Sequence, residues 1–200
     1  MTSKNAFNLC SLNVNGIHLK VKRNRVIEWI QAQKSLITFL QETHFDVNIE
    51  NDLNDKSDYD VFCSHGTTAS RGVAIFMKKS LHYELINKYN DTDGRLILIN
   101  VEINNTIFTL VCIYAPNCRS SRNSFFKKVS DKIQEHGISI PIVGGDFNET
   151  LKVIDRKTSR SNQSNQPVSS LKNLIKSNKT GRHLAIFKWK YTTIYMEKKR

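Results

Sequence analysis

The chain has 200 residues, of which 39% are hydrophobic, and this is enough for one domain with a substantial core. It holds no apolar stretch long enough for a signal peptide or a membrane span, so we expect an intracellular protein, nuclear or cytoplasmic. The net charge of +12 favours a nucleic-acid partner, but its location weakens that inference. Residues 156–200 hold 12 basic residues against one acidic residue, whereas residues 1–155 are nearly neutral, with 18 against 17.

Apolar and β-branched segments of four to eight residues recur along the chain and predict strands. Residues 104 and 105 are both Asn, and they separate two segments in which apolar and polar residues alternate. This pattern predicts a β-hairpin and favours a partly antiparallel sheet. The polar stretch at 157–166 predicts a loop. The predicted strands are 7–14, 36–40, 73–77, 96–103, 107–114 and 138–143, and the predicted helices are 22–33, 122–136 and 168–177.

The cysteines and histidines of the chain form no recognisable metal-binding pattern. The four cysteines are scattered without a CxxC pair, and the six histidines match no ligand spacing. The sequence therefore predicts neither a disulfide framework nor a zinc site.

Polar side chains follow several of the predicted strands at the point where each strand ends. They are Asn13, Glu42, Tyr114, Asp146 and Asn148. In mixed α/β folds the carboxyl ends of neighbouring strands meet in one crevice, so residues far apart in the sequence can form one site. For any one of these residues an ordinary polar strand end is the alternative interpretation; their repetition favours a common site.

The motifs around these residues resemble those of the endonuclease/exonuclease/phosphatase superfamily. The resembling segments are SLNVNG (11–16), FLQETH (39–44), RGVAIFMKK (71–79), GRLILINVEI (94–103), IYAPN (113–117) and GGDFNETLKVIDR (144–156). Their order and spacing are most similar to the apurinic-type endonuclease domain of LINE-type (non-LTR) retrotransposons, which is related to exodeoxyribonuclease III. The resemblance implies an α/β fold, a four-layer sandwich of two packed mixed sheets flanked by helices.

The same resemblance implies roles for the strand-end residues. Glu42, assisted by Asn13, would hold Mg²⁺, with Mn²⁺ as an alternative, because hard cations take oxygen ligands. Asp146 would orient or deprotonate the attacking water, and Asn148 and Tyr114 would contact the phosphate. The implied partner is DNA, with no organic cofactor and no membrane. Asn15, Lys22 and Arg23 would lie near the DNA backbone, although a plain surface role is the alternative for these three.

The sequence departs from the family pattern after the helix at 168–177. The family continues with further strands and a Ser-Asp-His motif, and none of these segments is present in this sequence. We therefore expect an incomplete domain at 1–178 that lacks its C-terminal strands, followed by a basic, aberrant tail at 179–200. Loss of the His predicts a rate lowered by about 10²- to 10⁴-fold. The alternative is a catalytically inactive remnant that binds nucleic acid through the basic tail.

Overall fold

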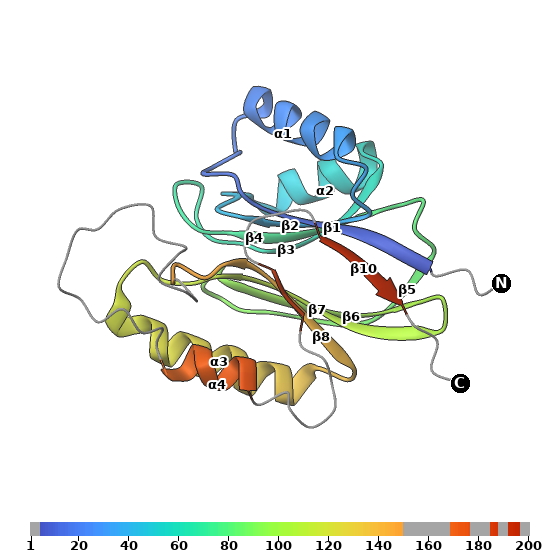
Figure 1. The fold of residues 1–200 in the computed structure, drawn as a ribbon. Helices are drawn as coiled ribbons and strands as arrows, with labels where there is room; N and C mark the ends of the chain where they lie inside the picture. The colour runs from blue at the N-terminus through green and yellow to red at the C-terminus, as the bar shows by residue number, and fades with distance from the viewer. Residues whose placement is uncertain (1–4, 150–168, 177–184, 188–191, 197–200) are drawn as a thin grey trace.

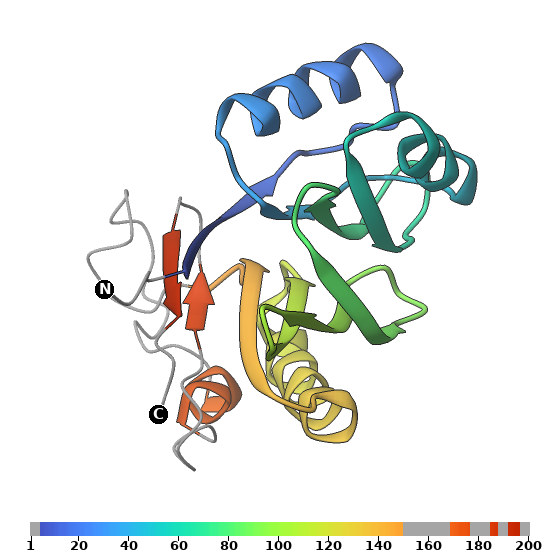
Figure 2. The same ribbon diagram turned by 90° about the vertical axis from the view of Figure 1, so that its right-hand side faces the viewer.

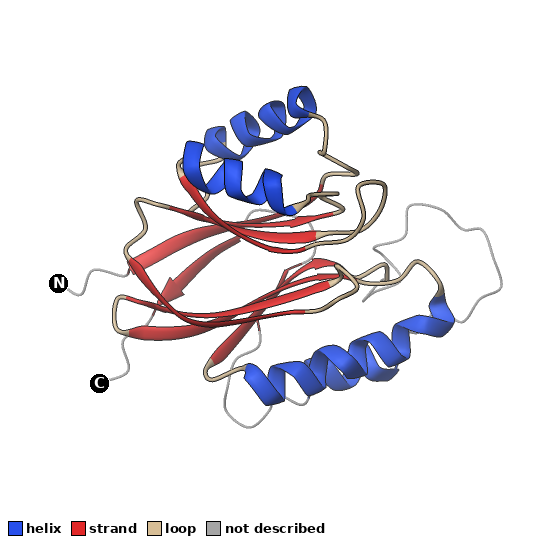
Figure 3. Cartoon of the chain, turned by 180° about the vertical axis from the view of Figure 1, so that it is seen from behind, coloured by secondary structure: helices blue, strands red, loops and turns tan. Residues whose placement is uncertain are grey.

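Two five-stranded β-sheets pack face to face, and a pair of helices covers the outer side of each (Figure 1, Figure 3). The structure is a computed structural model, and it describes residues 5–149, 169–176, 185–187 and 192–196. The predicted loop at 157–166 and the motif residues Asp155 and Arg156 lie outside these residues. The four-layer α/β sandwich implied by the motifs is confirmed. None of the described helices is both long and apolar enough to cross a membrane.

The first sheet has the strand order β10-β1-β2-β4-β3. Strands β1 and β2 run parallel, and every other neighbouring pair in this sheet is antiparallel. Its outer face packs against two helices, through a cluster that includes Ile30, Leu53 and Phe76. The elements of this half are β1 (Asn5–Asn13), α1 (Lys20–Ala32), β2 (Ile37–Gln41), α2 (Val47–Lys56), β3 (Tyr59–Ser64), β4 (Val73–Lys78) and β10 (Thr192–Met196).

The second sheet has the order β5-β6-β7-β8-β9, in which β7, β8 and β9 run parallel. The turn between β6 and β7 places Asn104 and Asn105 at φ 51° and 59°. Two successive positive φ values belong to the tight hairpin turns that Asn favours, so the predicted hairpin is confirmed. The elements are β5 (Tyr83–Asn90), β6 (Leu96–Ile103), β7 (Thr106–Tyr114), α3 (Arg119–His136), β8 (Ile140–Asp146), α4 (Ser169–Lys176) and β9 (Ala185–Phe187).

The largest apolar cluster fills the space between the two sheets and joins Phe39 and Ile75 of the first to Ile99 and Leu110 of the second. The sheets approach most closely at Gly144. A Cβ atom added there would lie 2.4 Å from Cδ2 of Phe39. This contact explains why a glycine, which has no side chain, occupies an otherwise apolar strand.

Replacing Gly144 with alanine should therefore destabilise the fold without changing any polar group. Over-packing of a filled core costs about 1–3 kcal/mol. For a chain of this size that lowers Tm by roughly 2–10 °C, which thermal unfolding followed by circular dichroism would measure. The double variant Gly144→Ala/Phe39→Leu should recover part of the loss, because it makes room at the contact. Strictly additive losses would contradict this packing argument.

Two strands of the tail complete the edges of the sheets. β10 pairs antiparallel with β1, and β9 pairs parallel with β8 (Figure 2). The expectation that the chain lacks strands after residue 178 is thus wrong for residues 185–187 and 192–196. Their short, irregular apolar pattern gave no strand signal in the sequence. The domain boundary predicted at residue 178 stays a prediction.

Three further elements, α2, β3 and β5, had no counterpart among the predicted segments. β5 is an edge strand whose side chains are mostly exposed, so it lacks the apolar pattern that marks a strand. The apolar residues of α2 are the exposed Val47 and the buried Ile49 and Leu53, and its other residues are polar. Its start is fixed by Asp46, whose side chain accepts a hydrogen bond from the Ile49 backbone N–H at 2.9 Å.

Candidate active site

The five strand-end residues lie together at one end of the sandwich, where the two sheets meet. The parallel register pairs Asn13 at the end of β1 with Gln41 at the end of β2, and Glu42 follows directly. In the second sheet the same kind of register pairs Tyr114 at the end of β7 with Asp146 at the end of β8. Parallel neighbours thus bring their carboxyl ends to one edge in each sheet, as the sequence predicts.

The side chain of Asn13 connects the two sheets at this point. Its Nδ2 donates to Oε1 of Glu42 at 2.7 Å and to Oδ2 of Asp146 at 3.1 Å. Its Oδ1 accepts the backbone N–H of Asn15 at 3.0 Å. Asn13 therefore holds two carboxylates from different sheets next to each other, which is unfavourable for like charges unless a donor or a cation lies between them.

This hydrogen-bond pattern bears on the role expected for Asn13. A metal ligand would have to present its amide oxygen, but here the NH₂ group faces the carboxylates. Turning the amide over would place Oδ1 toward them and would remove the acceptor of the Asn15 N–H. In the arrangement observed, Asn13 positions Glu42 and Asp146 and turns its amide nitrogen, not its oxygen, toward both carboxylates.

Glu42 has the unusual φ of 56° for a residue with a side chain. Such left-handed conformations store strain and persist only where neighbouring contacts fix the backbone. Those contacts are present. The Gly16 N–H donates to the Glu42 carbonyl at 2.7 Å, and the Thr43 N–H donates to the Gly72 carbonyl at 3.1 Å. The strain is thus held at the position that carries the proposed ligand.

Tyr114 lies beside Glu42 and is 7% exposed. Burial raises the pKa of Tyr114 to about 12, and a hydrogen bond to Glu42 and the charge of that carboxylate act in the same direction. The phenol is therefore a neutral hydrogen-bond donor throughout the physiological pH range. The phenol can donate a hydrogen bond to a negatively charged oxygen, but it does not act as a base near pH 7.

Arg95 is a contributor to the site that the sequence did not single out, although it lies in the GRLILINVEI motif. Its guanidinium carbon lies 4.9 Å from the centre of the Tyr114 ring, and its Nη1 donates to the Tyr114 carbonyl at 3.1 Å. Asp91 in turn accepts the Arg95 backbone N–H at 2.9 Å. Arg95 therefore fixes both the ring and the backbone of Tyr114. The Gly-Arg pair at the start of β6 is the signal in the sequence.

Asp146 is held by the segment that follows it. Its Oδ1 accepts the Asn148 backbone N–H at 2.9 Å, and its own carbonyl accepts the Ala115 N–H at 2.8 Å. Asn148 has a φ of 46°, and its Nδ2 donates to the Ala115 carbonyl at 2.7 Å. One of its two amide hydrogens is used in this way, which leaves the other for a substrate oxygen.

The three residues expected near a DNA backbone have different surroundings. Lys22 is exposed and its Nζ donates to the Asn15 carbonyl at 2.6 Å, so Lys22 and Asn15 lie together beside the carboxylates. Arg23 is only 7% exposed, and its guanidinium donates to the carbonyls of Ile17 and His18. These contacts direct Nη1 of Arg23 toward carbonyls of the chain itself, and its role near DNA stays a prediction.

The donor atoms at this edge suit a hard divalent cation. Glu42 and Asp146 supply carboxylate oxygens, and the described part of the chain brings no thiol or imidazole into hydrogen bonds with either carboxylate. Oxygen donors favour Mg²⁺, Mn²⁺ or Ca²⁺ over zinc. A cation bound at Glu42 would also reduce the repulsion between the two carboxylates.

Comparisons with known proteins agree with this fold. A model of the Endonuclease/Exonuclease/phosphatase family matches residues 10–194 of the chain. The sequence is 29% identical over 164 residues to the Transposon TX1 uncharacterized 149 kDa protein of Xenopus laevis. That match covers 82% of this chain but 12% of the relative, so the chain spans a small part of the relative's length.

Solved structures show the same fold at lower identity. The AP endonuclease LMAP from Leishmania major has a TM-score of 0.67 at 18% identity, over 87% of this chain and 67% of that one. TDP2 of D. rerio, complexed with a single strand DNA product, has a TM-score of 0.59 at 19% identity, over 75% and 64%. An AP endonuclease from Archaeoglobus fulgidus has 0.57 at 22%, over 76% and 61%. The predicted family is confirmed: the chain belongs to the Endonuclease/Exonuclease/phosphatase family.

Proposed function

We propose that this chain carries the active site of a Mg²⁺-dependent DNA endonuclease, a phosphodiesterase of the retrotransposon endonuclease type. The observation that carries the proposal is the Asn13 amide, which holds Glu42 and Asp146 together across the two sheets at hydrogen-bond distance. One carboxylate is then placed to hold a cation, while the other is placed to act on water. The similarity to a transposon protein and to AP endonucleases supports DNA as the substrate.

The proposed mechanism assigns a separate task to each group. Asp146, fixed by the Asn13 amide and the Asn148 N–H, accepts the proton of the attacking water. Tyr114 donates a hydrogen bond to a phosphate oxygen, and Asn148 does so with its remaining amide hydrogen. Glu42 would hold the divalent cation, which would supply positive charge against the negative charge that grows on the phosphate. Lys22, exposed beside Asn15, contacts the DNA backbone.

We expect a low turnover from the chain as it stands. The sequence contains no Ser-Asp-His run, and the residue before His183 is Arg182. Without the histidine of that motif, a contribution of about 10²- to 10⁴-fold to the cleavage rate is absent. The appropriate assay is therefore nicking of supercoiled plasmid DNA with protein in excess, so that slow single turnovers are counted.

The outcome expected is slow conversion to nicked circles in Mg²⁺ or Mn²⁺, with none in EDTA. Isothermal titration with Mg²⁺ reports binding separately from cleavage. Nicking that persists in EDTA, or no Mg²⁺ binding together with no nicking, would refute the proposal. Turnover as fast as that of an efficient nuclease would instead contradict the expected impairment.

Replacing Tyr114 with phenylalanine should lower the nicking rate by about 10- to 100-fold, since it removes one donor near the reacting phosphate. The pKa of about 12 gives a second, more specific expectation. The Tyr114 phenol stays protonated between pH 6 and pH 9. It therefore contributes no titration to the pH–rate profile in this range, and the profile should have the same shape in Tyr114→Phe as in the parent. If the rate of the parent rises or falls with pH in this range and that dependence is lost in Tyr114→Phe, Tyr114 titrates there and the expectation is wrong.

A further inference from the structure

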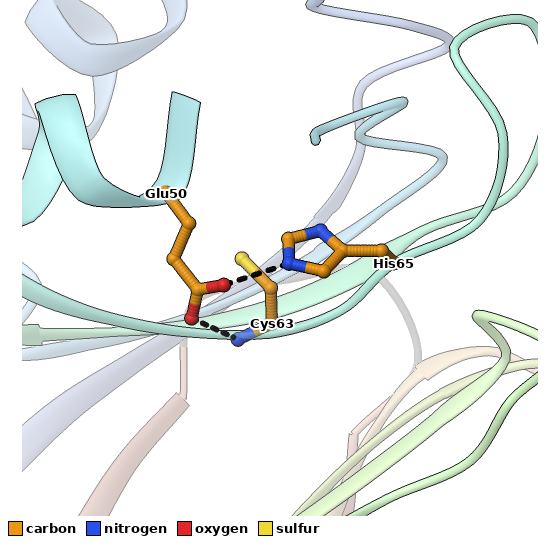
Figure 4. A group of neighbouring side chains, drawn as sticks. All are labelled: Glu50, Cys63 and His65. Carbon is orange, nitrogen blue, oxygen red and sulfur yellow. Dashed lines mark hydrogen bonds and ion pairs between the residues drawn. The ribbon is translucent and has the colours of Figure 1, made fainter. Parts of the chain in front are cut away.

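A second group of side chains able to bind a metal lies on the outer side of the first sheet. Glu50 comes from α2, Cys63 from β3, and His65 from the chain just after β3 (Figure 4). Their ligand atoms all lie within 4.8 Å of one another. Cys63 and His65 are two residues apart at a strand end, so their side chains point to the same side. This spacing matches no short metal motif, because the third member comes from a helix.

The two ring nitrogens of His65 both face acceptors. Nδ1 lies 3.2 Å from the carbonyl of Phe45, and Nε2 lies 2.8 Å from Oε2 of Glu50 (Figure 4). Both partners can only accept, and a neutral imidazole has one N–H, so it satisfies either the Phe45 carbonyl or the Glu50 carboxylate and not both. With the hydrogen on Nδ1, the Nε2 lone pair faces Glu50, and a cation placed there would satisfy both groups.

Cys63 adds a sulfur atom to these two donors. Its side chain is 4% exposed, and within the described residues its thiol makes no hydrogen bond. The backbone N–H of Cys63 donates to Oε1 of Glu50 at 3.1 Å, which holds the carboxylate next to the sulfur. The side chains of Glu50 and His65 are 15% and 31% exposed, so an ion could enter from solvent.

We propose that Glu50, Cys63 and His65 form a second metal site, which takes a borderline transition ion such as Zn²⁺ and not Mg²⁺. Thiolate, imidazole and carboxylate form a donor set that zinc accepts and magnesium does not. Binding releases the Cys63 thiol proton to solvent as the sulfur–metal bond forms, and Nε2 of His65 donates its lone pair to the ion. Water fills the fourth position.

The geometry needs only a small adjustment to hold the ion. Ligand atoms around tetrahedral zinc lie roughly 3.5 Å apart, given bonds of about 2.0–2.3 Å. The Nε2–Oε2 contact of 2.8 Å would open by about 0.7 Å, and the widest separation of the cluster, at most 4.8 Å, would close by up to about 1.3 Å. Nδ1 of His65 lies 3.2 Å from the Phe45 carbonyl, so with its hydrogen on Nδ1 the ring would make the outer contact typical of a metal-bound histidine.

The position of the site suggests what an ion would do there. The Phe45 carbonyl that orients His65 lies three residues after Glu42, and Asp46 caps the helix that carries Glu50. A bound ion would therefore tie α2 and β3 to the segment that bears Glu42. We expect it to stabilise this segment, and the site stands independently of the DNA-cleaving activity.

Cobalt supplies a direct test, because a thiolate bound to Co²⁺ gives an intense near-ultraviolet charge-transfer band. We expect the intact chain to show this band and to saturate at a single equivalent. Zn²⁺ at about 100-fold its dissociation constant should raise Tm by roughly 5–10 °C. Mg²⁺ should compete for neither response. Cys63→Ser should abolish the band, and His65→Gln should weaken the binding of Co²⁺ by at least tenfold.

Two variants control for other binding positions. Cys118 is exposed and free, so Cys118→Ser tests whether a surface thiol gives the band, and Glu42→Gln tests the carboxylate edge; both should keep the signal. Absence of the band in the intact chain, or an equal band in Cys63→Ser, would overturn the proposal.

Discussion

The variant Asp146→Asn should lose about 10²- to 10⁴-fold of the Mg²⁺-dependent nicking rate, because it removes the group that accepts the proton of water. The carboxylate receives an N–H at each oxygen, from Asn13 at Oδ2 and from Asn148 at Oδ1. An amide of the same shape can accept at only one of these positions and presents a donor to the other. The substitution therefore removes the base and also loosens its alignment.

The measurement is single-turnover nicking with Asp131→Asn as the matched control. Asp131 is exposed on α3, where it pairs with Lys127. The control should nick at the parent rate. Thermal unfolding should show that Asp146→Asn still folds, since the change conserves volume. An Asp146→Asn chain that nicks within a factor of about three of the parent would remove Asp146 from the mechanism.

The sequence was sufficient to predict most of the sheets because buried strands carry a readable pattern. β2, β4, β6 and β7 are each nearly continuous apolar runs, and all four were predicted. β5 escaped because an edge strand with exposed side chains has no such run. β9 and β10 escaped because they are held by backbone pairing to β8 and β1, which leaves no local pattern in the sequence.

Some features of the candidate site could be predicted from motifs, and others depend on the three-dimensional arrangement. Motifs placed Glu42, Tyr114 and Asp146 at strand ends, and parallel pairing brought those ends together. The direction of the Asn13 amide depends on which neighbours surround it, and a sequence contains no record of that. Arg23 shows the same limit, because a basic cluster is identical in sequence whether its members face solvent or a carbonyl pair.

The cluster of Glu50, Cys63 and His65 is a group that sequence spacing could not predict. Searches for spacing treat metal ligands as neighbours in the chain, so a helix residue that joins two strand residues is not found. Folding brings α2 against β3 through Ile49 and Val61, and it brings the donors together as a consequence. The sequence predicted no zinc site because that prediction used only spacing along the chain, whereas the proposed site depends on packing.

Glu42→Gln should lower nicking by at least about 100-fold at low Mg²⁺ and should raise the Mg²⁺ concentration needed for half-maximal rate by more than tenfold. Loss of the charged oxygen weakens the binding of a hard cation, and more Mg²⁺ recovers part of the rate. The change keeps a side chain at φ 56°, so the backbone strain is the same in both forms. Glu28→Gln, an exposed position on α1, is the matched control and should leave both quantities unchanged.

Comparison of the two carboxylate variants separates their roles. Asp146→Asn should reduce the maximal rate with little change in the Mg²⁺ midpoint, whereas Glu42→Gln should mainly shift the midpoint. Equal shifts would mean that both carboxylates bind the ion, and the Asn13 amide would then have to present its oxygen. Glu42→Gly adds a test of strain: glycine adopts positive φ freely, so this variant should lose the same activity while retaining or gaining thermal stability. A stability loss would show that the Glu42 side chain, through Asn13 and Tyr114, also holds the two sheets together.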